Sequence, residues 1–349
     1  MSLVVWIVFL AFVLTMVLLD LGVFHRKAHA VRIQEALAWT FFWVFLALMF
    51  NVLVFFLYRG DLAAWVGVPT QQLSAQAAAE QFLAGYVLEK SLSVDNIFVI
   101  ALIFAYFSIP LAQQHRILFW GILGAVVLRG VMIALGAALI ARFEWVVYVF
   151  GALLLISAVK MLRFQHDSIE PGRNPLVRLA RRLYPVSGDV HCGRFFVLLD
   201  GRRAMTPLML ALLLVESSDV LFAVDSIPAV FAVTRDPFLV FTSNIFAILG
   251  LRSLYFVLAG FMNKFRYLKM SLVFVLSYVG VKMMLSHHYP IPTLVSLAII
   301  GGILCVGVLA SLVGTKPDTA QLVSPPMPTP PATRGDAGGY GDSGRRTRD

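Results

Sequence analysis

The chain has 349 residues, of which 60% are hydrophobic and 13% are charged, and its mean hydropathy is +0.85. This small number of polar side chains cannot cover the surface of a soluble core. The composition therefore excludes a soluble globular protein and predicts a multi-span helical membrane protein. The net charge of +9 alone would suit a nucleic-acid partner, but the placement of the basic residues along the chain argues against such a partner.

Apolar runs of about 20 residues predict an all-α, polytopic transmembrane bundle of about nine spans. The runs lie near residues 3–24, 37–57, 78–107, 117–140, 143–163, 205–233, 238–259, 269–286 and 291–313. We expect the first run to be retained, because no positive residue precedes it and it is too long for a signal peptide. The transmembrane domain therefore covers residues 1–313. Residues 164–203 form an Arg-rich cytoplasmic loop, and residues 314–349 form a cytoplasmic tail that we expect to be disordered.

Lysines and arginines gather in the odd-numbered connections between the predicted helices and in the tail. The even-numbered connections hold only Arg59, Arg142 and Arg235. The positive-inside rule then places the N-terminus outside and the C-terminus in the cytoplasm of a bacterial cytoplasmic membrane. Because this orientation explains the basic balance, we expect no nucleic-acid partner.

The third predicted helix, near residues 78–107, carries Glu89 and Asp95. It is longer than a straight span requires, so it must tilt, bend or break. The fourth predicted helix carries Arg129, and the fifth carries Lys160 near its cytoplasmic end. A charge inside a membrane span is costly, so each of these residues indicates either a function or a buried pair.

The sixth, seventh and eighth predicted helices repeat the same order of charges. Their charged residues are, in order, Glu216, Asp219, Asp225, Arg252 and Lys282. Overlay of the two acidic segments places Glu89 on Asp219 and Asp95 on Asp225. Pro228, shortly after Asp225, removes a backbone hydrogen bond and predicts a kink in the sixth helix.

The two halves therefore form a repeat of two three-helix units, near residues 78–163 and 205–286. Because three is an odd number of spans, the second unit must be inverted relative to the first, as in many secondary transporters. The helices near residues 3–24, 37–57 and 291–313 lie outside this repeat.

The acidic segments supply carboxylate, amide and hydroxyl oxygens, and no histidine or cysteine joins them. The candidate metal ligands are Glu89, Asp95, Asn96, Glu216, Ser218, Asp219, Asp225 and Ser226. Oxygen ligands suit hard divalent cations such as Mn²⁺, Mg²⁺ or Ca²⁺ and disfavour Zn²⁺ or Cu⁺. Arg129, Arg252, Lys90 or bound protons would balance the surplus negative charge, which makes proton-coupled exchange a natural mechanism.

A structural interpretation of the same charges stays open. Asp95 with Arg129, and Asp225 with Arg252, would then be buried ion pairs that hold helices together. Lys160 and Lys282, near helix ends, are expected to extend their ammonium groups toward the membrane surface.

Motifs of other chemistries are missing from the sequence. The cysteines Cys192 and Cys305 form no CxxC pair, and neither a Gly-rich phosphate loop, a Ser/His/Asp set nor an HExxH motif occurs. We therefore expect no enzyme activity and no resident cofactor.

The chain resembles the TerC family of integral membrane proteins, named for tellurium resistance and placed in a wider group with the LysE-like transporters. The resemblance rests on the segments Glu89-Lys-Ser-Leu-Ser-Val-Asp-Asn96, Glu216-Ser-Ser-Asp-Val-Leu-Phe-Ala-Val-Asp-Ser-Ile-Pro-Ala229 and Ser243-Asn-Ile-Phe-Ala-Ile-Leu-Gly-Leu-Arg-Ser-Leu-Tyr-Phe256. It implies manganese efflux, in some bacteria the supply of manganese to secreted metalloenzymes, and a functional role for the acidic residues at positions 89, 95, 216, 219 and 225.

The sequence thus predicts an exporter of divalent metal, Mn²⁺ first, that works by alternating access at a midplane carboxylate site between the third and sixth helices. The alternatives are a non-transporting membrane adaptor or metalation partner, resistance to a tellurium oxyanion, and Ca²⁺ transport. Membrane lipid is an expected partner. The sequence leaves open a homo-oligomer and other membrane partners.

Overall fold

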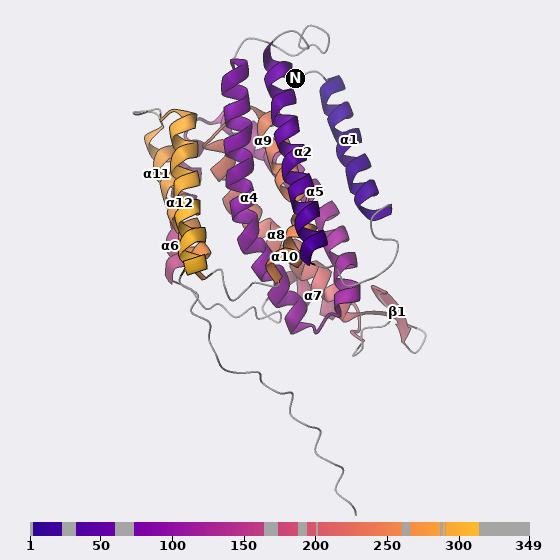
Figure 1. Cartoon of the computed structure of the whole chain (residues 1–349). Helices are drawn as coiled ribbons and strands as arrows, with labels where there is room; N and C mark the ends of the chain where they lie inside the picture. Colours follow the sequence, from indigo (N-terminus) through magenta and orange to yellow (C-terminus); the bar gives the residue numbers. More distant parts are fainter. Residues whose placement is uncertain are drawn as a thin grey trace, which may run out of the picture. The chain divides into compact units, whose positions relative to one another are not determined.

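The computed structural model describes residues 3–22, 33–59, 73–163, 174–187, 194–199, 202–259, 266–286, 289 and 291–313. Its helices are α1 (Leu3–Gly22), α2 (Ile33–Arg59), α4 (Ala75–Tyr106), α5 (Leu111–Arg142), α6 (Val146–Arg163), α7 (Pro175–Leu183), α8 (Pro207–Phe231), α9 (Pro237–Ile248), α10 (Leu251–Ala259), α11 (Arg266–Leu285) and α12 (Thr293–Val313). One antiparallel hairpin joins β1 (Phe196–Leu199) to β2 (Arg202–Met205). The predicted all-α class is confirmed (Figure 1). The tail 314–349 lies outside the described residues.

Several helices have the length and composition of membrane spans. Within the described residues, α2, α5, α6, α8 and α12 qualify, and the bent pair α9–α10 makes a sixth. α1 and α11 hold shorter apolar stretches, Leu3–Val17 and Met270–Leu285. α4 has 32 residues but carries Glu80, Glu89, Lys90 and Asp95, so composition alone does not mark it as a span. The chain is a multi-pass membrane protein, and the count of about nine spans stays a prediction.

The helices of the two predicted repeats pack against each other reciprocally. α4 packs on α9 and α5 packs on α8, so the first helix of each unit contacts the second helix of the other. α6 packs on α11, which pairs the two third helices. Gly151 and Gly280 allow this close approach, because a Cβ atom on either would lie 3.2 Å from the backbone oxygen of the other. This exchange of partners is what a two-fold relation between the units requires.

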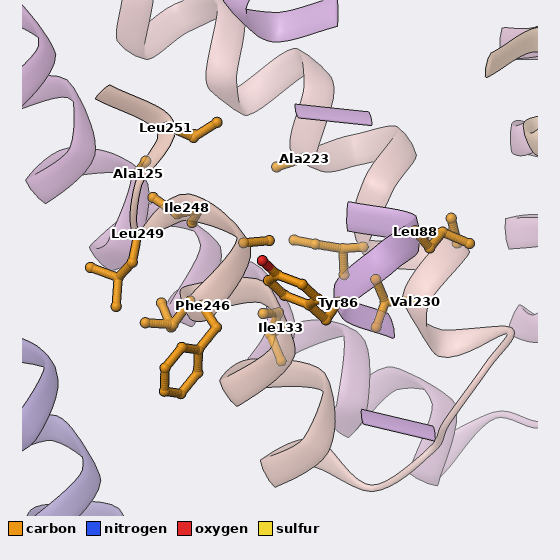
Figure 2. Close-up of a cluster of buried hydrophobic side chains, with 14 of the residues drawn as sticks. Tyr86, Leu88, Ala125, Ile133, Ala223, Val230, Phe246, Ile248, Leu249 and Leu251 are labelled. Carbon is orange, nitrogen blue, oxygen red and sulfur yellow. The ribbon is translucent and has the colours of Figure 1, made fainter. Parts of the chain in front are cut away.

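The core lies where α4, α5, α8 and α9 meet. Figure 2 shows Tyr86 and Leu88 of α4, Val230 of α8 and Phe246 of α9 within one apolar cluster. α2 and α12 pack on the outside of α4. α1 lies against α9 through Phe9, whose ring centroid is 5.8 Å from that of Phe238.

The predicted helix near 238–259 is in fact broken. α9 ends at Ile248 with Leu249 as its C-cap, Gly250 has a φ of +82°, and α10 continues at an angle of 42°. Lys90 of α4 donates to the carbonyl oxygens of Ala247 at 3.1 Å and Leu249 at 3.4 Å, and so satisfies backbone acceptors at the break. α8 continues through Pro228 to Phe231, so the helix is not interrupted there, and the kink expected at this proline stays a prediction.

The loop predicted at residues 164–203 contains regular structure that the sequence interpretation missed. α7 and most of the β1–β2 hairpin lie within it, and β2 ends at Met205. These elements are too short for the hydropathy scan that found the spans.

We predict that Gly250→Ala destabilises the fold. A side chain at a φ of +82° is strained, and a Cβ atom there would lie 2.8 Å from Trp43. The unfolding free energy in detergent should fall by about 1–3 kcal/mol. The matched control is Gly301→Ala on α12, where a Cβ atom meets nothing within 4 Å. Equal stability of the two variants would contradict the strain argument.

Candidate functional site

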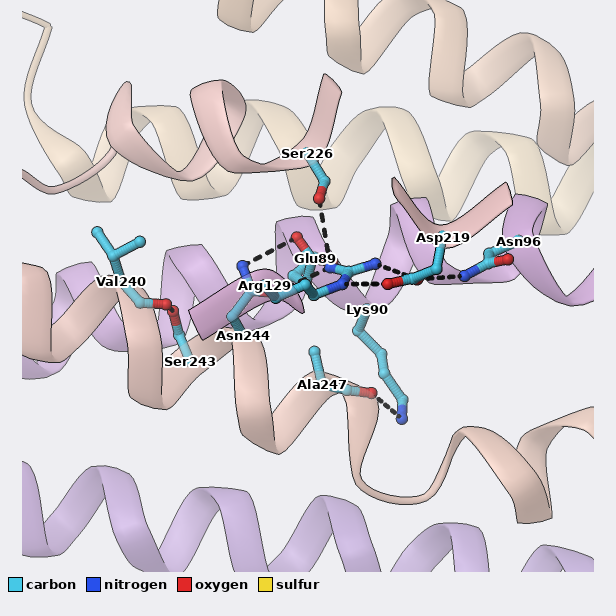
Figure 3. A network of polar contacts seen from close by, with 10 residues as sticks. All are labelled: Glu89, Lys90, Asn96, Arg129, Asp219, Ser226, Val240, Ser243, Asn244 and Ala247. Carbon is cyan, nitrogen blue, oxygen red and sulfur yellow. Dashed lines mark hydrogen bonds and ion pairs between the residues drawn. The ribbon is translucent and has the colours of Figure 1, made fainter. Parts of the chain in front are cut away.

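The centre of the site is the guanidinium of Arg129, which extends from α5 into the junction with α4, α8 and α9. Its side chain is 1% exposed. Its Nε and Nη2 atoms donate to the two carboxylate oxygens of Asp219 at 3.3 Å and 3.0 Å, and Nη1 donates to Glu89. Figure 3 shows the guanidinium between these two carboxylates. One buried cation therefore joins an acid from each repeat.

Amide and hydroxyl groups complete this network. Arg129 Nη1 also donates to Asn244 Oδ1 at 2.9 Å and to Ser226 Oγ at 3.3 Å. Asn244 Nδ2 donates to Glu89 Oε2 at 3.3 Å, and Asn96 Nδ2 donates to Asp219 Oδ1 at 2.9 Å. The two carboxylates thus accept from α5 and from neutral donors on α4 and α9. Such extra hydrogen bonds are what make a buried ion pair tolerable.

The network itself holds two carboxylates and one guanidinium, in a place where Glu89 is 0% and Asp219 is 4% exposed. A second basic side chain, Lys90, follows Glu89 on α4 and donates to the Ala247 and Leu249 carbonyl oxygens. Asn96 Oδ1 is buried and has no hydrogen-bond partner among the described residues. A buried acceptor without a partner, beside two carboxylates, favours a further cation or proton at this place.

Glu216 lies beside the network without joining it. Its half-buried carboxylate rests against Gly124 of α5, where a Cβ atom would overlap it. Its buried Oε2 atom has no hydrogen-bond partner in the part of the chain that the structure describes. Gly124 therefore leaves the space that this carboxylate fills.

The other candidate ligands are directed elsewhere. Asp225, half-buried on α8, accepts a hydrogen bond from Ser157 of α6 at 2.6 Å and is attracted by Lys160. Ser218 donates to the Leu214 carbonyl of its own helix at 2.8 Å. Asp95 is half-buried and has an interaction partner.

The structure gathers four of the eight predicted ligands around one point. These are Glu89, Asn96, Asp219 and Ser226. In this conformation, among the described residues, no group of three or more His, Cys, Asp or Glu side chains is placed to hold a metal ion.

The ion pairs considered from the sequence were wrong in their partners. Arg129 bonds Glu89 and Asp219 rather than Asp95, and Asp225 bonds Ser157 rather than Arg252. Arg252 is buried on α10 at 4% exposure and has an interaction partner. Sequence spacing alone could not assign these pairs, because it does not say which helices are neighbours.

Asn244 is the site residue that the sequence interpretation missed. It is 0% exposed and bonds both Arg129 and Glu89. The available signal was an amide side chain inside the apolar run near 238–259, where it needs a partner.

The fold and this site define a multi-pass helical membrane protein with a buried, oxygen-rich charged centre at the contact of two repeats. Residues 74–319 match the integral membrane protein TerC family, and the chain belongs to that family.

Named relatives of this chain are also membrane proteins. An uncharacterized membrane protein of Myxococcus xanthus is 50% identical over 89% of this chain and 92% of its own length. The putative membrane-bound redox modulator Alx of Escherichia coli K12 is 48% identical over 80% of this chain and 84% of its own. An uncharacterized membrane protein of Rickettsia bellii is 34% identical over 88% and 97%. No solved structure matches the chain.

We predict strong coupling between Arg129 and its acids. Arg129→Met leaves two buried carboxylates without their cation and should lower the unfolding free energy by about 3–5 kcal/mol. Adding Asp219→Asn should recover part of that loss, with a coupling of about 0.5–3 kcal/mol in a double-mutant cycle followed by denaturation in detergent. The control is Arg142→Met, an exposed arginine at the end of α5. If both arginine variants lose equally little stability, Arg129 does not hold the junction.

Proposed function

We propose that this chain exports a hard divalent cation, Mn²⁺ in the first place, by alternating access between its two repeats. The observation that carries the proposal is that Glu89 and Asp219 both bond the buried guanidinium of Arg129. These acids are equivalent in the sequence repeat, and they belong to the first helices of the two units. A site on the axis between repeats is where secondary transporters bind their substrates.

The donor set supports a hard cation. Among the described residues, the hydrogen-bond acceptors of Arg129 are carboxylate, amide and hydroxyl oxygens. Such oxygens suit Mn²⁺, Mg²⁺ and Ca²⁺. Two carboxylates neutralise one divalent ion, whereas with one guanidinium they keep a negative charge. A divalent cation therefore matches this pair better than the guanidinium does.

The arginine itself suggests the mechanism. In the described conformation, the guanidinium of Arg129 bonds both carboxylates. A metal ion can therefore bind them only when the guanidinium moves away. Release of the metal lets Arg129 return and keeps the buried acids compensated between transport cycles. The break between α9 and α10 lies beside the site and gives one repeat a place to bend.

Proton coupling would act through the acids that Arg129 does not bind. Glu216 and Asp225 are half-buried on α8, and Glu216 has a buried oxygen without a partner among the described residues. In the proposed cycle, these carboxyl groups would take up a proton when the metal leaves and give it up when a metal ion binds. These two residues are our candidates for the proton carriers.

The alternative functions make different demands on the same site. An oxyanion would need an arginine free to bind it, and the donors of Arg129 are engaged by Glu89, Asp219 and neutral groups. An adaptor would act through the Arg-rich loop and the tail and would not need the buried acids. Ca²⁺ would use the same oxygens as Mn²⁺, so the choice between them rests with a flux assay.

The assay is Mn²⁺ uptake by vesicles holding purified protein. We expect flux to fall to the level of protein-free vesicles in Glu89→Gln and in Asp219→Asn, because each change removes a charge that binds the ion. Glu80→Gln is the matched control, since this acid lies on the same helix and bonds Gln76 at 3.0 Å. An entrapped pH dye should report protons moving opposite to the metal, and Ca²⁺ serves as competitor.

Wild-type flux in both site variants would reject the carboxylate mechanism. No flux from well-folded wild-type protein would favour the adaptor, and deletion of residues 314–349 should then abolish function in cells. An exporter should keep its flux after that deletion.

We further propose a bacterial cytoplasmic membrane with the N-terminus outside. Cysteines placed at Glu144, in the turn between α5 and α6, and at Arg182 of α7 should then lie on opposite sides of the membrane. With Cys192 and Cys305 replaced, a membrane-impermeant maleimide on intact cells should label position 144 and spare position 182. The reverse pattern would invert the proposed orientation.

A further inference from the structure

α7 is an amphipathic helix with most of its apolar arc uncovered. Val177 and Ala180 are buried, and α7 packs on α8. Leu176, Leu179 and Leu183, next to them on the same side of the helix, are 46%, 53% and 65% exposed. Exposed leucines on the spans face acyl chains, but these leucines lie in a connection between spans and need another explanation.

The opposite side of α7 is basic. It carries Arg178, Arg181 and Arg182, all exposed, and three arginines in nine residues make the segment strongly positive. A helix with leucines along one side and arginines along the other has the pattern of segments that lie in the plane of a membrane surface.

The β1–β2 hairpin extends this surface. Val186, just after α7, forms a parallel bridge with Met205 of β2, and the rings of Tyr184 and Phe196 pack with centroids 6.1 Å apart. Leu198 of β1 is 75% exposed. We call residues 174–187, 194–199 and 202–205 the α7–hairpin platform.

The charge of the platform has one sign. Its described residues contain no acid, and its exposed arginines are Arg178, Arg181, Arg182, Arg194, Arg202 and Arg203. Exposed leucines interleaved with exposed arginines match the boundary of a bilayer that contains anionic lipid, where acyl chains meet negatively charged headgroups.

We propose that the α7–hairpin platform binds anionic phospholipid, with its leucines in the acyl boundary and its arginines on the phosphate groups. The platform is also tied to the candidate site. Asn174, whose Oδ1 caps α7, donates through Nδ2 to Ser217 Oγ of α8 at 2.7 Å, and Ser217 lies between Glu216 and the Asp219 that binds Arg129. This lipid contact does not depend on which ion is transported.

The first test measures the depth of the platform. In a variant with Cys192 and Cys305 replaced, spin labels at Leu179→Cys and Leu198→Cys are compared with one at Arg181→Cys. In phosphatidylcholine vesicles containing phosphatidylglycerol, the two leucine positions should be more accessible to oxygen than to a water-soluble nickel complex. The arginine position should show the reverse.

The second test measures the lipid itself. We expect the triple variant Arg178→Gln/Arg181→Gln/Arg182→Gln to bind phosphatidylglycerol more weakly, by about fivefold for each arginine removed. Phosphatidylglycerol retained by the purified protein in detergent is the quantity measured. The matched control removes three exposed arginines elsewhere, Arg142, Arg163 and Arg235, and should keep the lipid. An unchanged unfolding temperature in the triple variant shows that its fold is intact.

Two results would overturn the proposal. One is water-accessible labels at positions 179 and 198 in vesicles with phosphatidylglycerol. The other is labels shielded equally without anionic lipid and broadened by a neighbouring label, which would show that a second copy of the chain covers the platform. Neither result involves metal flux, so failure here is separate from failure of the proposed transport.

Discussion

The buried contact of Arg129 with Glu89 and Asp219 is the constraint on which the centre of the structure depends. Three charged groups held away from water are tolerated only if every donor finds an acceptor in good geometry. The groups that meet this demand come from α4, α5, α8 and α9. The network therefore fixes the depth of four helices relative to one another. Contacts between apolar side chains specify that depth poorly, because lipid tails are as apolar as the side chains.

Under the proposed function, the same network has to serve both stability and transport. A site closed around a guanidinium holds the helices together, yet in the proposed cycle a cation must take the place of that guanidinium. The unused Asn96 oxygen makes the arginine an incomplete match for its pocket. A cation that fits better can therefore compete, and a site whose two occupants have similar affinity can alternate between states.

Small residues set the space around this centre. Gly124 admits the Glu216 carboxylate, and Gly250 allows α9 to end beside the side chain of Lys90. At Gly124 the reason is room, and at Gly250 it is a backbone conformation that other residues adopt with strain. The contact of Asn174 with Ser217 brings the connection between the repeats within a few residues of the centre. Part of the Arg-rich loop predicted from the sequence is thus packed against the helices.

The sequence by itself determined the class of protein, the charged residues of the spans and the oxygen chemistry of the site. It also paired Glu89 with Asp219 as equivalent positions, because a repeat is visible in one dimension. Spacing along a helix fixes depth and face, at about 1.5 Å and 100° per residue.

Only the tertiary structure decided which charges meet, because that depends on which helices are neighbours. Arg129 contacts residues 40, 90 and 115 positions away along the chain. No local pattern distinguishes Glu89 from Asp95 as its partner, or reveals that Asn244 completes the network. The break at Gly250 and the α7–hairpin platform likewise depend on contacts between distant segments. Short elements such as α7 and α10 gain their stability from the helices they pack against.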